Sequence, residues 1–67
     1  MTDFQKYQER LEYIEYLAQR RSTGTSKILA QKLGISISTV KRMIRYLKQK
    51  GVKIKFDKLQ QTYFIDN

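Results

Sequence analysis

The sequence of 67 residues contains no cysteine, no histidine and no proline. The absence of cysteine excludes disulfide bonds and thiolate metal sites, and the absence of histidine removes the usual general base and the commonest metal ligand. No apolar run approaches the ~18 residues of a membrane span, and the N-terminal stretch MTDFQKYQER lacks the pattern of a signal peptide. We therefore expect a soluble, cytoplasmic protein without a metal or cofactor.

Negative charge is also scarce, and it is unevenly placed. The net charge is +8, from 14 lysines and arginines against 6 acidic residues. Residues 1–19 carry a local charge of −2, whereas residues 20–58 carry twelve cations against Asp57 alone. Such segregation indicates one side that faces a polyanion and another that faces solvent or a partner. A merely solvated basic surface is the alternative that composition leaves open.

The chain shows no internal repeat and no low-complexity linker, so we expect one domain over residues 1–67. Apolar residues at helical spacing predict a first helix over residues 4–20. This stripe consists of Phe4, Tyr7, Leu11, Ile14, Leu17 and Ala18. Arg20 and Arg21 would then lie at the helix C-terminus, where the helix dipole favours positive charge.

A second helix is predicted over residues 26–33, with Thr25 or Ser26 as its N-cap. Gly34 follows it, where a left-handed residue commonly ends a helix. The apolar side of this helix is expected to consist of Ile28, Leu29 and Leu33.

A third helix is predicted over residues 37–50, capped by Ser36 and ended by Gly51. Its inward stripe consists of Val40, Met43, Ile44 and Leu47. Beyond Gly51 the apolar period changes from helical spacing to alternation, which predicts strands over residues 52–56 and 61–65. Val52, Ile54 and Phe56, with Tyr63 and Ile65, are expected to face the core. The fold class is therefore mainly α with a small β-hairpin.

The second and third helices have the spacing of a helix-turn-helix. Two helices that cross at ~90–120° need a turn of three or four residues, and glycine reverses the chain there without a Cβ clash. Ala30 lies four residues before Gly34 and leaves room for close packing, and Val40 lies six residues after it and can fill the gap between the helices.

The stretch LAQKLGISISTVKRMIRYLKQKGVKIKF resembles the winged-helix module at the N-termini of DeoR-type regulators and the biotin operon repressor. The resemblance covers roughly residues 8–65. It is carried by Leu29, Ala30, Leu33, Gly34, Ile35, Ser36, Thr39, Val40 and Arg42, followed by Lys50, Gly51 and Val52. It implies a three-helix winged helix-turn-helix that binds double-stranded DNA sequence-specifically in transcription control, in association with the nucleoid. The chain departs from relatives at the wing turn, which has no glycine, and at Thr62, where relatives often have glycine.

On a helical wheel, Ser38, Arg42, Arg45 and Gln49 fall within one arc opposite the inward stripe, flanked by Lys41 and Tyr46. Because the first turns of such a helix reach base edges, the base-reading candidates are Ser38, Thr39 and Arg42. Arg42 is the candidate for bidentate contact with guanine. The candidates for phosphate contact are Lys27, Lys32, Ser36, Lys41, Arg45, Lys53, Lys55 and Lys58. The alternative is that these cations only solvate the surface, and Lys48 and Lys50 also suit the helix dipole.

An enzyme is not expected, because the sequence has no phosphate-binding glycine loop, no nucleophile–base pair and no metal-spaced cluster. A protein-docking or RNA-binding winged helix is the alternative from another class. RNA readers usually place stacking aromatic residues beside their cations, and only Tyr46 and Phe64 are candidates here. Tyr16 points away from the core face of the first helix, with Tyr13 at its edge. They are either ordinary surface tyrosines or contacts of a weak homodimer through that helix. No small-molecule site is expected.

Overall fold

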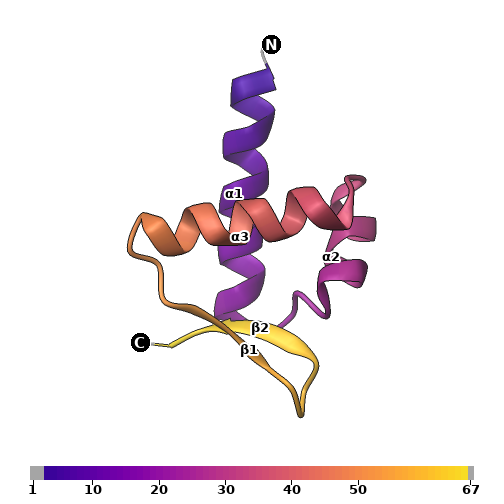
Figure 1. Ribbon diagram of the computed structural model, residues 1–67, viewed down its shortest axis with the longest axis vertical. Helices are drawn as coiled ribbons and strands as arrows, with labels where there is room; N and C mark the ends of the chain where they lie inside the picture. Colours follow the sequence, from indigo (N-terminus) through magenta and orange to yellow (C-terminus); the bar gives the residue numbers. More distant parts are fainter. Residues whose placement is uncertain (1–2, 67) are drawn as a thin grey trace.

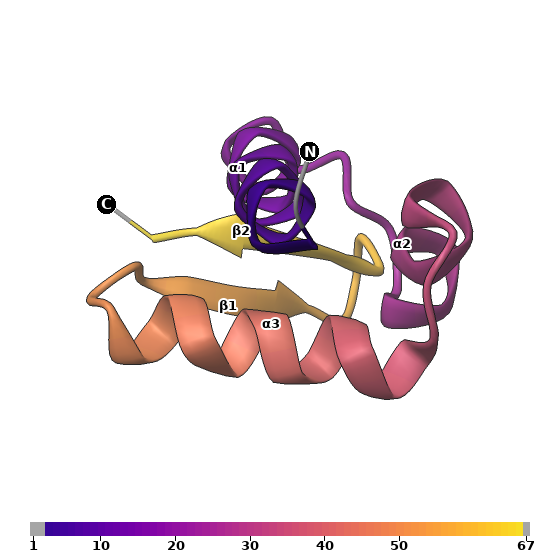
Figure 2. The ribbon, with the colours of Figure 1, turned by 90° about the horizontal axis from the view of Figure 1, so that it is seen from above.

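The computed structural model describes residues 3–66 and has three helices followed by a two-stranded hairpin (Figure 1). The elements are α1 (Asp3–Gln19), α2 (Ser26–Leu33), α3 (Ile37–Gln49), β1 (Ile54–Asp57) and β2 (Thr62–Ile65). In Figure 2, α1 and α3 lie on opposite sides of the molecule, and Figure 1 shows α3 crossing α1 with the hairpin below the crossing, near the C-terminal end of α1. The predicted fold class is confirmed. No helix among the described residues is long and apolar enough to cross a membrane.

The expected stripe of α1 forms the base of the core. Leu11, Ile14, Leu17 and Ala18 are buried, whereas the side chain of Phe4 lies outside the described part of the chain. The helix ends at Gln19, slightly earlier than predicted. Arg21 has a φ of 53°, in the left-handed region, and the Ser22 amide donates to the Leu17 carbonyl at 2.9 Å. This tight turn directs Arg21 toward the hairpin instead of the helix terminus.

The two helices α2 and α3 have the predicted N-caps, and the turn between them has the predicted glycine. Thr25 accepts a hydrogen bond from the Ile28 amide at 3.3 Å. Gly34 is left-handed (φ 69°, ψ 34°), and the Ser36 Oγ accepts from the Thr39 amide at 3.2 Å. The Ile35 amide donates to the Ala30 carbonyl at 3.1 Å, so α2 ends at the left-handed Gly34 and α3 begins directly after the Ser36 cap.

The helix-turn-helix core also agrees with prediction, with one exception. Ala30 and Val40 are buried where the two helices meet, and the rest of the expected α3 stripe is buried too. Ile28 is the exception, since it is 44% exposed. A Cβ built on Gly24 would lie 2.9 Å from the Ile28 Cγ2, so Ile28 covers the loop before α2 instead of entering the core.

The hairpin pairs Ile54 with Ile65 and Phe56 with Tyr63 in antiparallel register. Ile54 is buried, and Tyr63 and Ile65 pack against the core as expected. The inward position predicted for Phe56 is wrong, since it is 38% exposed. Its ring meets the Tyr63 ring edge-on at 4.9 Å between centroids instead of entering the core.

Candidate nucleic-acid interface

The outward side of α3 is polar and accessible. Ser38, Arg42, Arg45 and Gln49 are all exposed, on the side of the helix opposite its buried stripe. In Figure 2, α3 lies at one side of the molecule, so the side of the helix opposite its buried stripe faces away from α1. A helix presented in this way can enter a major groove, which is wide enough for one α-helix.

The two base-reading candidates with hydroxyl groups, Ser38 and Thr39, have different surroundings in the first turn of α3. Ser38 is exposed, whereas Thr39 is half-buried and its Oγ1 lies 2.8 Å from the Ser36 Oγ within the cap. Thr39 is therefore held by the fold, while Ser38 faces outward. The exposed Ser36 is the cap of α3 and lies beside its N-terminal amides, an arrangement suited to an anion.

A shallow hollow of about 250 Å³ lies between α3 and β2. It is lined by Lys41, Ile44, Arg45, Lys48 and Tyr63. The fold thus brings the phosphate candidates Lys41 and Arg45 together with Lys48. The sequence alone offered another explanation for Lys48, a favourable interaction with the helix dipole. Tyr63 packs against the core and also lines this hollow beside the three cations, and alternation predicted only the first of these roles.

Lys53, Lys55 and Lys58 are exposed on or beside the hairpin. The Lys55 Nζ lies 2.8 Å from Asp66 Oδ2, and this hydrogen bond, with the charge of Lys55, holds the pKa of the Asp66 carboxyl below its usual value. Lys55 therefore already has an anionic partner in the chain. Lys58 lies in the wing turn beside Leu59, which is 96% exposed.

The two lysines of α2 have different surroundings. Lys27 is exposed, whereas the Lys32 Nζ donates to the Ser22 carbonyl at 2.7 Å. Lys32 also lines a hollow between α1 and α2 together with Glu9 and Tyr13. The structure therefore places Lys32 on the α1 side of α2, apart from the outward side of α3.

Tyr46, expected to flank the reading arc, packs toward α1. Its ring meets the Tyr7 ring edge-on at 6.1 Å between centroids, and the Lys50 ammonium group lies 5.8 Å from the centroid of the Tyr46 ring. A residue at the edge of the outward arc can still reach α1, because α3 crosses that helix closely (Figure 1). Tyr46 thus holds α3 at its crossing point.

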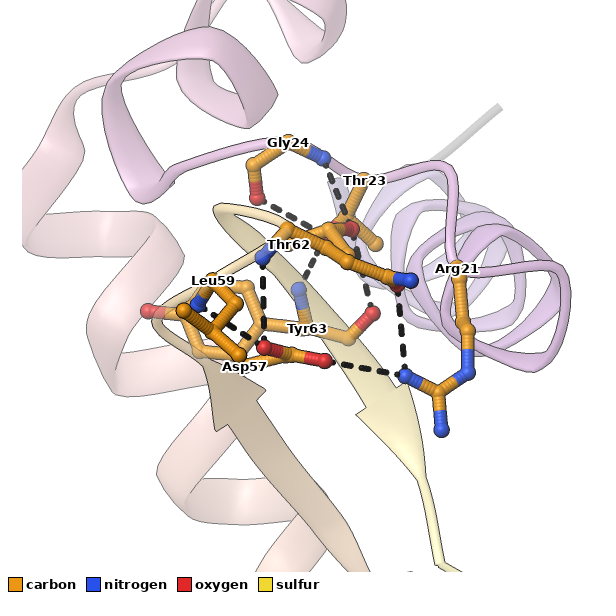
Figure 3. A network of polar contacts seen from close by, with 8 residues as sticks. Arg21, Thr23, Gly24, Asp57, Leu59, Thr62 and Tyr63 are labelled. Carbon is orange, nitrogen blue, oxygen red and sulfur yellow. Dashed lines mark hydrogen bonds and ion pairs between the residues drawn. The ribbon is translucent and has the colours of Figure 1, made fainter.

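Thr23 and Thr62 form a buried polar contact, here called the threonine lock, that joins the α1–α2 loop to the hairpin (Figure 3). Their hydroxyl oxygens lie 3.1 Å apart, and Thr62 also accepts from the Gly24 amide at 3.1 Å. Thr23 in turn accepts from the Tyr63 amide at 2.9 Å. Thr62 therefore has a structural role in joining the hairpin to the α1–α2 loop.

Arg21 reinforces this attachment from the solvent side (Figure 3). Its guanidinium lies 3.2 Å from Asp57 Oδ2 and 4.3 Å from the centroid of the Phe64 ring. The other oxygen of Asp57 accepts from the amides of Leu59 and Gln60 and closes the wing turn. An aspartate that accepts from amides two and three residues ahead is a common turn former, and Gln61 takes the left-handed conformation in this turn (φ 55°). The sequence signal for this turn was Asp57, but nothing local pointed to Arg21.

The comparisons with known proteins agree with this architecture. A family model described as an HTH domain matches residues 9–59, which is 51 of the 67 residues. No curated protein and no solved structure matched the chain. The closer likeness to DeoR-type regulators and the biotin operon repressor stays a prediction. With three helices, the turn at Gly34 and a hairpin after α3, the chain belongs to the HTH domain family and is a winged helix-turn-helix DNA-binding domain.

Proposed function

We propose that this domain binds double-stranded DNA sequence-specifically, with α3 in the major groove and the hairpin on the sugar–phosphate backbone, and that it serves transcription control. The observation that carries the proposal is the outward side of α3, where Ser38, Arg42 and Arg45 are exposed at one side of the molecule. Among the described side chains neither Arg42 nor Arg45 forms a salt bridge, so both guanidinium groups are available to DNA.

Arg42 and Ser38 are the base-reading residues in this proposal, and Arg42 makes the bidentate contact with guanine. Lys41 and Arg45 flank them and bind phosphate, together with Lys48 in the hollow beside β2. We assign Thr39 a supporting role, because its hydroxyl is held in the cap.

The remaining phosphate contacts come from outside α3. They are assigned to Ser36, Lys27, Lys53, Lys55 and Lys58. Lys32 is assigned to the fold, because its ammonium group binds the Ser22 carbonyl.

Two observations favour duplex DNA over RNA. Single-stranded RNA is read by aromatic side chains on which unpaired bases stack. The two aromatic residues considered for that role are both engaged, since Tyr46 packs on Tyr7 and Arg21 covers Phe64. The exposed cations on α3 do not need unpaired bases and suit a groove lined by phosphates.

One module of this size covers ~600–1,000 Å² of DNA-binding surface, which usually requires a second module for operator specificity. A weak homodimer through α1 would supply it, and Tyr13 and Tyr16 are exposed on that helix. Analytical ultracentrifugation of the domain, free and on its preferred duplex, tests this pairing. A strict monomer in both states contradicts it.

The decisive experiment distinguishes contacts to base edges from contacts to the sugar–phosphate backbone. A preferred duplex is first selected from random DNA, and Arg42→Ala and Lys53→Ala are then measured on that duplex and on random duplex. Arg42→Ala should cost about 1–3 kcal/mol on the preferred site and little on random DNA. Lys53→Ala should weaken both by a similar factor and lower the salt slope by about one. Equal losses on both DNAs for Arg42→Ala contradict its role as reader.

A further inference from the structure

Ile37, the first residue of α3, is exposed although it is large, branched and apolar. It is 40% exposed, whereas Val40 and Ile44, further along the same helix, are buried. Burial of apolar surface stabilises a fold by about 25 cal/mol per Å², and an exposed side chain does not contribute this free energy. The core therefore does not explain why an isoleucine stands at this position.

The position of Ile37 on the helix places it at the edge of the proposed reading surface. At about 100° per residue, Ile37 lies one residue before the outward-facing Ser38 and about 40° from Lys41. Lys41 lines the hollow between α3 and β2. Ile37 is thus one turn before Lys41 on the hairpin side of α3, within the first turn, which reaches base edges in a groove-binding helix.

The other isoleucine with similar exposure has a structural explanation that Ile37 lacks. Ile28 is 44% exposed, and its Cγ2 lies so near Gly24 that a Cβ there would be only 2.9 Å away. It therefore covers the left-handed turn before α2. Ile28 provides a matched control for substitutions of Ile37, since the two residues have the same side chain and comparable exposure but lie on different helices.

Only one group on the major-groove edge of DNA matches an aliphatic side chain. Thymine carries a C5 methyl group, whereas the other bases present hydrogen-bond donors and acceptors there. A β-branched side chain has one strongly preferred rotamer in a helix, so Ile37 would meet that methyl group with little loss of freedom.

We propose that Ile37 is a specificity-determining residue that packs against the C5 methyl group of a thymine, beside the base pairs read by Ser38 and Arg42. This inference rests on the proposed function, because it requires α3 to lie in the major groove. It adds a requirement for one thymine, recognised by apolar contact, to the hydrogen-bonded reading of guanine.

The test uses the duplex selected with the wild-type domain. Each thymine is replaced in turn by deoxyuridine, which lacks only the methyl group. One replacement should weaken wild-type binding about fourfold, the factor for one buried methyl group. Ile37→Ala should bind the thymine and deoxyuridine duplexes equally at that position, whereas Ile28→Ala and the conservative Ile37→Val should keep most of the difference. A duplex in which 5-methylcytosine–guanine replaces the same thymine–adenine pair should bind better than a duplex with cytosine–guanine at that position. These two duplexes differ only by the methyl group.

The outcomes distinguish this inference from the proposed function. If no duplex is preferred over random DNA, sequence-specific binding fails and the inference falls with it. If a duplex is preferred but every thymine can be replaced by deoxyuridine without loss, only the role of Ile37 is overturned. That role is overturned in the same way if Ile37→Ala keeps the full discrimination. Thermal melts accompany each variant, and an exposed position should leave the melting temperature nearly unchanged.

Discussion

Replacing Thr62 with valine tests the threonine lock, because the two side chains have almost the same shape and differ by one hydroxyl group. In the native domain that hydroxyl accepts from the Gly24 amide at 3.1 Å and lies 3.1 Å from the Thr23 oxygen. Thr62→Val leaves the Gly24 amide without its acceptor. Thr23 is 0% and Thr62 4% exposed, so water cannot easily take the place of the lost partner.

The size of the effect follows from these contacts. An unsatisfied buried polar group costs about 1–3 kcal/mol. The additional methyl group offsets part of that cost, by at most about 0.8 kcal/mol. We therefore expect a net loss of about 1–2 kcal/mol, a large share of the roughly 3–10 kcal/mol typical for a domain of this length. The melting temperature should fall by about 4–8 °C for each kcal/mol.

Urea and thermal unfolding followed by circular dichroism measure this loss. Thr39→Val is the matched control, because its half-buried hydroxyl contacts only the Ser36 hydroxyl among the described side chains. It should change stability by less than about 0.5 kcal/mol. A Thr62→Val domain as stable as the control would refute the argument that the lock holds the hairpin.

The remaining predictions concern the turn glycines, the hairpin charge and salt. Gly34→Ala should cost about 1–2 kcal/mol from its left-handed φ alone, since a Cβ there meets nothing within 4 Å. Gly24→Ala should cost more in the same melts, because its Cβ meets Ile28. Asp66→Asn should release Lys55 and tighten duplex binding at low salt. Because the pKa of the Asp66 carboxyl is lowered, the group stays charged to a lower pH than an ordinary aspartate, so this gain should be full at neutral pH and should vanish only in acid, below the usual carboxyl range, as the wild-type carboxyl protonates. Duplex affinity should fall with salt with a logarithmic slope of about −5, for ~6 neutralised phosphates, and a slope near zero would contradict an electrostatic interface.

The parts of the fold that sequence predicted are those that depend on near neighbours. Thr25 and Ser36 accept from amides three residues ahead, and Gly34 is left-handed where the helix stops. Helical spacing identified the buried stripe of α3 because that face is set by the ~3.6-residue period alone. The exposed arc of α3 followed from the same arithmetic.

The parts that sequence missed depend on partners far along the chain. Thr23 and Thr62 are 39 residues apart, and Arg21 and Asp57 are 36 apart. A threonine in a loop and an arginine after a helix carry no periodic signal, so only the folded arrangement reveals these pairs. Phe56 was placed inward by alternation, which cannot indicate that its cross-strand partner Tyr63 packs against the core while Phe56 itself stays exposed. The engagement of Lys32 and Tyr46 also depends on how α1 meets the other helices.

In Figure 2, α1 and α3 lie on opposite sides of the molecule, and this separation affects how the domain would approach a polyanion. The helix from the acidic first segment, residues 1–19 with a charge of −2, lies on one side, and the cationic side of α3 lies on the other. A molecule with this asymmetry experiences a torque in the field of a polyanion before any atom touches, and such steering accelerates productive encounters. Moving negative charge from α1 to a surface beside α3 would lower the association rate without removing a single contact from the bound state.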